Sequence, residues 1–323
     1  MVGAPLLQVD DLQAHVFTKR GVVRAVDGVS FAVGYGETLG LVGESGCGKS
    51  MTCLSLVRLL PQPGGRIVGG RILLEGEDLT KKSEAEMRKV RGRRIAIVLQ
   101  DPLTSLNPAL CIGEQVAEVI RLHQGLRGRG VREKVVEALG RLKIPDAAAR
   151  LRHFPYQMSG GMRQRVVGAI ALACEPALLI ADEPTTSLDV TIQAQYLELL
   201  KELQSRLKFG IVFVTHDFGI VARMCDAVCV MYAGKVVEKA ATAELFANPV
   251  HPYTVALMDC LPSLDRRLET LALIEGQPPD LVSTPPGCAF APRCRKKMEI
   301  CTEKPPVASG LGRSHEVACW RAK

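Results

Sequence analysis

The chain has 323 residues, of which 47% are hydrophobic and 23% charged, and its formal net charge is +7. This length accommodates one large α/β domain with a small appendage, and the positive charge fits a polyphosphate ligand or an anionic membrane as well as a plain solvated surface. The N-terminal residues have neither a basic segment nor a long apolar run, and no stretch reaches the ~18 apolar residues that cross a bilayer, so we expect neither a signal peptide nor a membrane span.

The start of the chain predicts strands. Residues 6–17 and 22–33 alternate apolar and polar side chains with the period of two typical of half-buried strands, which indicates an antiparallel β layer. Residues 38–42 are wholly apolar, as in a buried parallel strand. Beyond them we expect a helix over 50–60 and strands over 71–79 and 94–99.

Residues 101–168 change to a helical pattern. Apolar residues recur at three- and four-residue spacing over 112–123, 131–142 and 160–174. A strand over 178–181, a helix over 190–208 and a strand over 211–215 follow, and this alternation predicts a parallel sheet with helices on its faces. Past residue 261 proline and glycine increase and periodicity fades, which indicates a small C-terminal module without a core of its own.

The segment Gly43-Glu-Ser-Gly-Cys-Gly-Lys49-Ser50, named here the phosphate loop, lies between the expected strand 38–42 and the helix that follows. Its glycines let the backbone curl, so that N–H groups at the positive end of the helix can bind a polyphosphate. In such a loop Lys49 reaches the β- and γ-phosphates and the Ser50 hydroxyl binds Mg²⁺. A chance glycine turn is the alternative, and the flanking strand and helix argue against it. The residues expected to contact nucleotide are Gly43, Ser45, Gly46, Cys47, Gly48, Lys49, Ser50 and Met51.

Polar residues also follow three of the expected strands. Asp182 ends an apolar strand, which places its carboxylate at the C-terminal edge of the sheet, where it can hold the magnesium shell. Glu183 is the candidate base that orients and deprotonates the attacking water. Gln100 can reach magnesium or water, and His216 can contact the γ-phosphate. A surface turn and a structural histidine are the simpler alternatives, and the shared strand-end position favours the catalytic roles.

The order of these motifs resembles that of the ATP-binding-cassette (ABC) ATPases across roughly residues 5–258. The hexapeptide Ser159-Gly-Gly-Met-Arg-Gln164 carries much of the resemblance, because many other nucleotide hydrolases have the phosphate loop alone. The matching motifs are Walker A (43–50), the Q-loop (Gln100), the signature (159–164), Walker B (178–182), the catalytic glutamate (Glu183), the D-loop (187–189) and the switch histidine (His216).

The resemblance implies the P-loop fold of this family, with a parallel core sheet, an antiparallel β layer and a helical subdomain over about 101–168, and ATP and Mg²⁺ as cofactors. Two such domains close head to tail on two ATP molecules. Family members usually stack an aromatic ring on adenine from a loop near residues 17–23, where Phe17 is the only ring. The implied nucleotide contacts outside the phosphate loop are Ser159, Gly160, Gly161, Gln164, Asp189 and Phe17.

A narrower resemblance covers almost the whole chain. The strings Gln100-Asp-Pro-Leu-Thr-Ser-Leu-Asn-Pro108 and Asn248-Pro-Val-His-Pro-Tyr253, with the cysteine tail, look like the ATP-binding subunits of dipeptide, oligopeptide and nickel importers. This implies an ATPase domain over 1–258 and a C-terminal module over 259–323, at the cytoplasmic face of the bacterial inner membrane. The implied solutes are di- or oligopeptides, with nickel or another small solute as the alternative.

The same resemblance implies partners. They are two transmembrane permeases, a second and homologous ATPase subunit, and indirectly a periplasmic solute-binding protein; no nucleic acid is expected. The rival is a non-transport ABC ATPase acting on DNA ends or ribosomes. DNA-repair members insert a long coiled coil before the signature and ribosome-associated members generally carry two cassettes, and this chain has neither. The complete set of hydrolytic motifs also argues against a purely metal-binding regulator.

The tail carries four cysteines: Cys288, Cys294, Cys301 and Cys319. Disulfides are disfavoured in a reducing cytosol, and zinc ligands usually come in closer pairs than these. An iron–sulfur cluster accepts wider spacing and needs four thiolates, and members of the resembled family have been described with a 4Fe–4S cluster here. We therefore favour a structural 4Fe–4S cluster, with Zn²⁺ as the alternative metal and a loop-rich tail with free thiols as the alternative to both.

Overall fold

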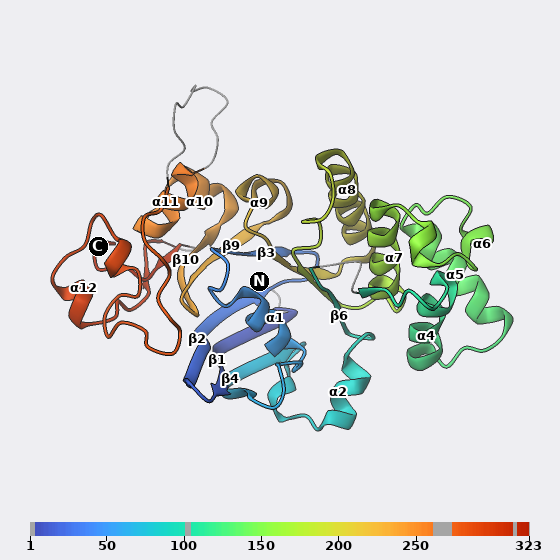
Figure 1. The fold of residues 1–323 in the computed structure, drawn as a ribbon, viewed down its shortest axis with the longest axis horizontal. Coiled ribbons are helices and arrows are strands. Elements are labelled where there is room, and N and C mark those ends of the chain that lie inside the picture. Colours follow the sequence, from blue (N-terminus) through green and yellow to red (C-terminus); the bar gives the residue numbers. More distant parts are fainter. Residues whose placement is uncertain (1–3, 101–104, 261–272, 313–314, 323) are drawn as a thin grey trace. The chain divides into compact units, whose positions relative to one another are not determined.

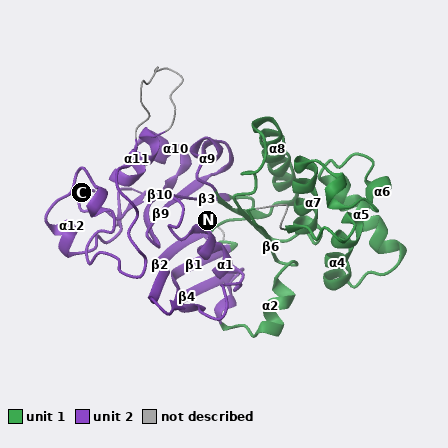
Figure 2. Cartoon of the chain, viewed as in Figure 1, with its two compact units in different colours: residues 1–6, 33–37, 81–214 green, residues 7–32, 38–80, 215–323 purple. Residues whose placement is uncertain are grey.

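The computed structural model describes residues 4–100, 105–260, 273–312 and 315–322. The chain divides into two compact units (Figures 1 and 2): unit 1 comprises residues 1–6, 33–37 and 81–214, and unit 2 comprises residues 7–32, 38–80 and 215–323. Each unit therefore combines segments that lie far apart in the sequence. Unit 1 contains the residues around Gln100 and Glu183, whereas unit 2 contains the phosphate loop and the C-terminal segment, residues 273–322.

Unit 1 contains a short parallel sheet. Strand β7 pairs in parallel with β6 and with β8, so that Ile180 lies opposite Ile97 on one side and Val212 on the other. These strands are apolar and almost wholly buried, as parallel strands usually are. The elements of unit 1 are β6 (Ile95–Val98), β7 (Leu178–Asp182), β8 (Gly210–Val214), α2 (Glu84–Val90), α4 (Ile112–Gln124), α5 (Arg129–Arg141), α6 (Ala147–Arg150), η2 (Pro155–Gln157), α7 (Gly160–Leu172) and α8 (Val190–Leu207).

Helices α4, α5 and α7 pack against one another beside the sheet of unit 1 (Figure 1). On α4 the buried residues Ile112, Val116 and Ile120 recur every four positions and form one apolar face. On α5 Val131 and Val135 do the same. The periodicity predicted this helical block, and the helix ends differ from the prediction by two residues or fewer in the described segments.

Unit 2 holds the N-terminal strands together with everything after β8. One sheet has the strand order β2-β1-β4-β5, with β1 and β4 antiparallel, which confirms the predicted antiparallel layer. Apart from single end residues of β2 and η1, the elements of unit 2 are β1 (Leu7–Thr18), β2 (Gly21–Val33), β3 (Thr38–Val42), β4 (Gly65–Leu74), β5 (Glu77–Asp78), β9 (Ala227–Tyr232), β10 (Lys235–Ala241), β11 (Ser309–Gly310), β12 (Glu316–Val317), α1 (Lys49–Leu56), α9 (Phe218–Met224), α10 (Thr242–Ala247), α11 (Pro252–Asp259), α12 (Ile300–Glu303), η1 (Leu79–Lys81) and η3 (Ala291–Arg293).

The second sheet region of unit 2 is mixed. Strands β3 and β9 run parallel, whereas β9, β10 and β12 pair antiparallel in succession, with Glu238 opposite Val317. Strand β11 then pairs with β12. The C-terminal segment thus extends a sheet that begins at β3, the strand leading into the phosphate loop. Sequence periodicity did not predict β11 and β12, because each of these strands is only two residues long.

Several predicted boundaries differ from those observed. Helix α1 ends at Leu56, four residues before the expected end, and strand β4 begins at Gly65, six residues before the expected start. Helix α2 was not predicted, although Ser83 and Glu86 form a complete capping box at its start. The Ser-x-x-Glu spacing was the sequence signal for it.

Candidate functional site

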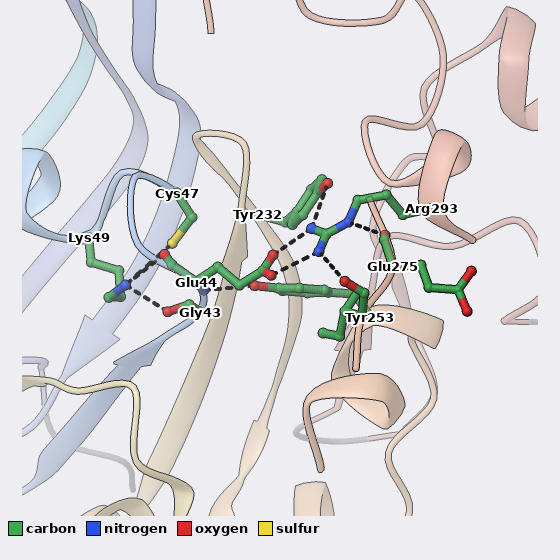
Figure 3. Close-up of polar contacts among 9 residues, drawn as sticks. Gly43, Glu44, Cys47, Lys49, Tyr232, Tyr253, Glu275 and Arg293 are labelled. Atoms are coloured by element: carbon green, nitrogen blue, oxygen red, sulfur yellow. Dashed lines mark hydrogen bonds and ion pairs between the residues drawn. The ribbon is translucent and has the colours of Figure 1, made fainter. Parts of the chain in front are cut away.

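The phosphate loop connects β3 to α1 in unit 2 (Figure 3). Gly43 and Gly48 have φ angles of +149° and +109°, in the region that favours glycine. A Cβ atom at Gly43 would collide with the carbonyl oxygen of Met231, and one at Gly48 with that of Ala25. Glycine is therefore required at both ends of the curl, and Gly48 caps the helix whose first turn supplies the positive dipole end.

Lys49 lies inside this loop. Its buried ammonium donates hydrogen bonds to the carbonyl oxygens of Gly43 at 2.7 Å and Glu44 at 2.9 Å, and it lies 3.7 Å from the Cys47 sulfur (Figure 3). Burial raises the pKa of the Cys47 thiol, and the nearby ammonium partly opposes that rise. The loop therefore wraps around a cation, which is the arrangement that recognition of a polyphosphate requires.

The remaining predicted contact residues of the loop differ in exposure. Ser45, Gly46 and Ser50 are exposed and Met51 is half-buried, whereas Cys47 is buried. The two serine hydroxyls are accessible to a ligand or a metal ion. Cys47 can offer a ligand only its backbone.

In unit 1 the predicted catalytic carboxylate lies directly after β7. Asp182 is the last residue of that strand and only 5% exposed. Glu183 has a φ angle of +46°, which is unusual for a residue with a side chain, and its N–H donates to the Val214 carbonyl at 3.0 Å. Its carboxylate accepts hydrogen bonds from the Gln100 amide and the Thr186 hydroxyl, both at 3.0 Å. The structure thus brings Gln100 and Glu183 together from two different strand ends.

The signature segment begins α7. The Ser159 hydroxyl caps this helix by accepting from the Met162 N–H at 3.3 Å. Gly160 is exposed and open, whereas a Cβ atom at Gly161 would lie 2.5 Å from the Ile192 side chain. Glycine is therefore needed at Gly161 for packing within unit 1.

Two further predicted residues belong to helix regions of unit 1. Gln164 of α7 is buried close to Tyr196, whose pKa is raised by burial to about 12. Asp189 of the D-loop caps α8, because its carboxylate accepts from the Ile192 N–H at 2.9 Å. The Asp189 side chain thus has a structural partner within its own unit, and for both residues contact with nucleotide stays a prediction.

His216 and Phe17 belong to unit 2. His216 lies after β8 and is exposed, directly before Asp217, which caps α9 with two hydrogen bonds. Phe17 is 45% exposed, and the Arg66 guanidinium lies 5.6 Å from its ring centroid. One face of this ring is therefore covered by a cation of the chain itself.

Two residues that the sequence did not assign to a site hold the phosphate loop from outside. The Arg293 guanidinium forms a double ion pair with the Glu44 carboxylate, at 2.6 and 2.9 Å (Figure 3). The Tyr253 hydroxyl accepts a hydrogen bond from the Glu44 N–H at 2.8 Å. Glu44 and Arg293 are 249 positions apart, and no local pattern in the sequence links them. The only sequence signal was the string that ends in Tyr253.

The four tail cysteines line one cavity of about 20 Å³, together with His251 and Phe290. All eleven cysteines of the chain are free thiols. Burial raises the pKa of the Cys288 and Cys294 thiols. Among the described residues, no three Cys, His, Asp or Glu side chains are placed to hold a metal ion. The donor chemistry suits a metal centre, but the observed positions do not form one.

In the part of the chain that the structure describes, no helix combines the length and the apolar character needed to cross a bilayer.

Two protein-family models match the chain. The model described as "ABC transporter" matches residues 26–186, and the model described as "Oligopeptide/dipeptide transporter, C-terminal region" matches residues 237–301. The second match extends across β10, α10 and α11 into the cysteine tail.

Similar proteins match over nearly the full length. The "Probable peptide ABC transporter ATP-binding protein y4tR" of Sinorhizobium fredii is 49% identical over 98% of this chain and 95% of its own. The dipeptide transport ATP-binding protein DppD of Bacillus subtilis is 47% identical over 98% of this chain and 94% of its own. Among solved structures, the dimeric cassette MJ0796 has 26% identity and a TM-score of 0.65, covering 73% of this chain and 98% of its own. The cbiO1 protein of Clostridium perfringens has 29% identity and a TM-score of 0.64, covering 76% and 92%.

The phosphate loop, the carboxylates after β7 and the fold shared with these cassettes define an ATPase of the ABC type, for which ATP with Mg²⁺ is the expected ligand. The match over almost the whole length then sets the family. The chain belongs to the peptide ABC transporter ATP-binding proteins.

Proposed function

We propose that this chain energises the import of dipeptides or oligopeptides through a bacterial inner-membrane ABC transporter. Its full-length relatives are named for peptide, dipeptide and oligopeptide transport. The match of residues 237–301 to the C-terminal region of oligopeptide/dipeptide transporters carries the proposal, because that region is not part of the general ABC transporter model, which matches residues 26–186. No feature of the described residues favours nickel or another small solute over peptides.

The proposed chemistry assigns one task to each group. The phosphate loop binds the nucleotide phosphates, with Lys49 as its cation. Ser50 and Asp182 hold Mg²⁺, Glu183 deprotonates the attacking water, and Gln100, hydrogen-bonded to Glu183, positions that water or the metal. His216 contacts the γ-phosphate, and Phe17 provides an apolar surface for adenine once Arg66 moves aside.

The proposed assembly is a head-to-tail pair with a second, homologous ATPase subunit, bound to two permeases at the cytoplasmic face of the membrane. The signature residues of each subunit then complete the nucleotide site of the other. The open surface at Gly160 supports this role, and the related MJ0796 cassette is described as dimeric. Residues 1–258 form the motor domain in this proposal, and residues 259–323 a C-terminal module.

We also propose that Cys288, Cys294, Cys301 and Cys319 hold a structural 4Fe–4S cluster, with Zn²⁺ as the alternative. Their shared cavity supports this, although the thiols would have to rearrange to ligate a common centre. Purified anaerobically, the protein should be brown and carry about four irons per chain. Colourless protein that carries zinc, or no metal, would contradict the cluster.

Uptake of labelled peptides tests the function. Cells that lack this chain should lose uptake of a labelled dipeptide, and re-expression of the wild type should restore it. A Lys49→Ala variant should not, because it loses the cation of the phosphate loop, and the purified variant should fail to bind ATP. The matched control is Lys134→Ala, which removes an exposed lysine of α5 paired with Glu137. Normal peptide uptake with impaired nickel uptake would refute the proposed solute while leaving the ATPase in place.

A further inference from the structure

Arg293 has an unusually complete set of hydrogen-bond partners for an arginine of a loop-rich tail. Its Nη1 donates to the Glu44 carboxylate at 2.6 Å and lies 3.3 Å from the Tyr232 hydroxyl. Its Nη2 donates to the other Glu44 oxygen at 2.9 Å and to the Ile274 carbonyl at 3.2 Å, while Nε donates to the Glu275 carbonyl at 3.0 Å. All five N–H groups of the guanidinium are therefore used (Figure 3).

The burial of this ion pair distinguishes it from the surface pairs of the chain. The Arg293 side chain is 4% exposed and that of Glu44 27%. By contrast, Arg295 pairs with Glu275 where both side chains are 82% exposed. A partly buried, bidentate pair fixes the orientation of both groups, whereas an exposed pair contributes little.

A second contact holds the same residue of the phosphate loop through its backbone. The fully buried Tyr253 accepts from the Glu44 N–H, and its ring packs against Tyr232 with centroids 4.6 Å apart. Glu44 is thus held at its backbone by α11 and at its carboxylate by Arg293. Because Lys49 donates to the Glu44 carbonyl, the position of Glu44 also bears on the phosphate-binding cation.

Both holding groups adjoin the cysteine cavity. Arg293 directly precedes Cys294, and His251 and Pro252, which begin α11, line the cavity with the four cysteines and Phe290. Phe290 packs against the rings of both Tyr232 and Tyr253, with centroids 5.3 Å apart in each case. The packing of the C-terminal segment is therefore continuous with the support of the phosphate loop.

We propose that Arg293 is a positioning residue of the nucleotide site: through Glu44 the C-terminal segment holds the phosphate loop in its binding conformation and thereby sets the affinity for ATP. This inference rests on the proposed role of the phosphate loop in binding nucleotide. Arg293 itself touches no reacting atom in this scheme. Loss of the Arg293 side chain leaves the side chains that act on water in place. It raises the free energy needed to order the phosphate loop around the phosphates.

The test uses the full-length chain, with equilibrium binding of ATP, and the assembled transporter, with steady-state hydrolysis. For Arg293→Ala we expect the ATP dissociation constant and KM to rise roughly tenfold, since small displacements of a binding group cost one to two orders of magnitude. The kcat should stay within about twofold of wild type, as for loss of uniform binding. Arg293→Lys should give an intermediate KM, because lysine keeps the charge but not the two-pronged geometry. Arg295→Ala is the matched control and should match wild type.

Unchanged ATP affinity in Arg293→Ala would overturn the proposal, and so would a fall in kcat at constant KM, which indicates only a smaller folded fraction. If Arg293→Ala does not fold, Glu44→Gln decides: a raised KM supports the inference, and an unchanged KM rejects it. The Lys49→Ala variant distinguishes a failure of the proposed nucleotide-binding role of the loop from a failure of the positioning role of Arg293. If that variant still binds ATP normally, the proposed role of the loop fails; if it loses ATP while the Arg293 variants do not, only the positioning role fails.

Discussion

The phosphate loop and the Glu183 turn both follow a buried parallel strand, yet they are held in different ways. The phosphate loop is fixed from behind by buried groups, Arg293 and Tyr253. The Glu183 carboxylate is held by Gln100 and Thr186, two exposed side chains on its own unit. Binding of a fixed anion profits from a rigid cradle, whereas a group that activates water must remain accessible to it.

Because of this difference, substitutions behind the phosphate loop and substitutions at the Glu183 turn should affect different properties of the protein. Changes behind the phosphate loop should alter stability and ATP affinity together, because the supporting groups are buried. Changes at the Glu183 turn should alter turnover alone.

The largest effect is expected at Glu183. Replacing it with glutamine keeps the size of the side chain but removes the base, so kcat should fall by about 10²–10⁴-fold. ATP should stay bound, and thermal unfolding should be unchanged. Single-turnover hydrolysis and a melting curve measure these outcomes, with Glu202→Gln, an exposed residue of α8, as control. Hydrolysis at the normal rate in Glu183→Gln would show that Glu183 is not the base that activates water.

Gly287→Ala should have the next largest effect. It changes the C-terminal segment, which supports the phosphate loop, and not the Glu183 turn. A Cβ atom at Gly287 would collide with the backbone of Cys301 and Thr302, inside the C-terminal segment. We expect a loss of about 2 kcal/mol of unfolding free energy, as for an overpacked site, together with weaker ATP binding. Urea denaturation and ATP titration measure both quantities. In the control Gly312→Ala the added methyl group meets no atom of the described residues within 4 Å. A destabilised Gly287→Ala variant with normal ATP affinity would break the link between the two properties.

The stability of the protein should also depend on pH through His251, which lies on the buried side behind the phosphate loop. Burial lowers the pKa of His251 from 6.5 to about 4, so below pH 6.5 the unfolded chain takes up a proton that the folded chain refuses. Stability is therefore complete above pH 6.5 and lost as the pH falls toward 4, by about 2 kcal/mol at pH 5. His251→Asn keeps an acceptor for the Tyr253 N–H, which the His251 Nδ1 provides, but does not titrate.

The difference in unfolding free energy between wild type and His251→Asn should accordingly shrink or reverse on acidification from pH 7.5 to pH 5. Chemical denaturation at both pH values measures it. A difference that does not depend on pH would show that His251 takes up its proton equally in both states.

The smallest effect is expected from Tyr253→Phe. It removes one hydroxyl and leaves the Glu44 N–H without that acceptor, at a cost of about 1 kcal/mol. ATP affinity should fall by roughly five-fold, which corresponds to the same free energy. The control is Tyr156→Phe, whose ring is 68% exposed. If Tyr253→Phe and Tyr156→Phe bind ATP equally well, the Tyr253 hydroxyl does not support the phosphate loop, and Arg293 remains as the supporting residue.

The sequence predicted what depends on local pattern. Periodicity identified α4, α5 and α8, and apolar runs identified β3 and β7, the strands that present the phosphate loop and Asp182. Gln100 and Glu183 were both assigned to strand ends, and because parallel strands end at a common edge, that position accounts for the hydrogen bond between them.

What the sequence did not predict depends on distant pairs. Glu238 is fully buried yet accepts from the Val250 and His251 N–H groups and lies 2.8 Å from the ring of His315. Nothing near Glu238 in the sequence distinguishes it from an exposed glutamate of an edge strand. The same holds for Arg293, one of several basic residues in the tail. Charge pairing across hundreds of residues leaves no period to detect.

The separation of Glu44 from Arg293 by 249 positions has a consequence for biosynthesis. A ribosome synthesises the glycine-rich turn well before it adds the guanidinium partner. If that partner sets affinity, a nascent subunit, or one terminated before Arg293, binds ATP weakly. Incomplete motors would then be poor competitors for nucleotide in the cell.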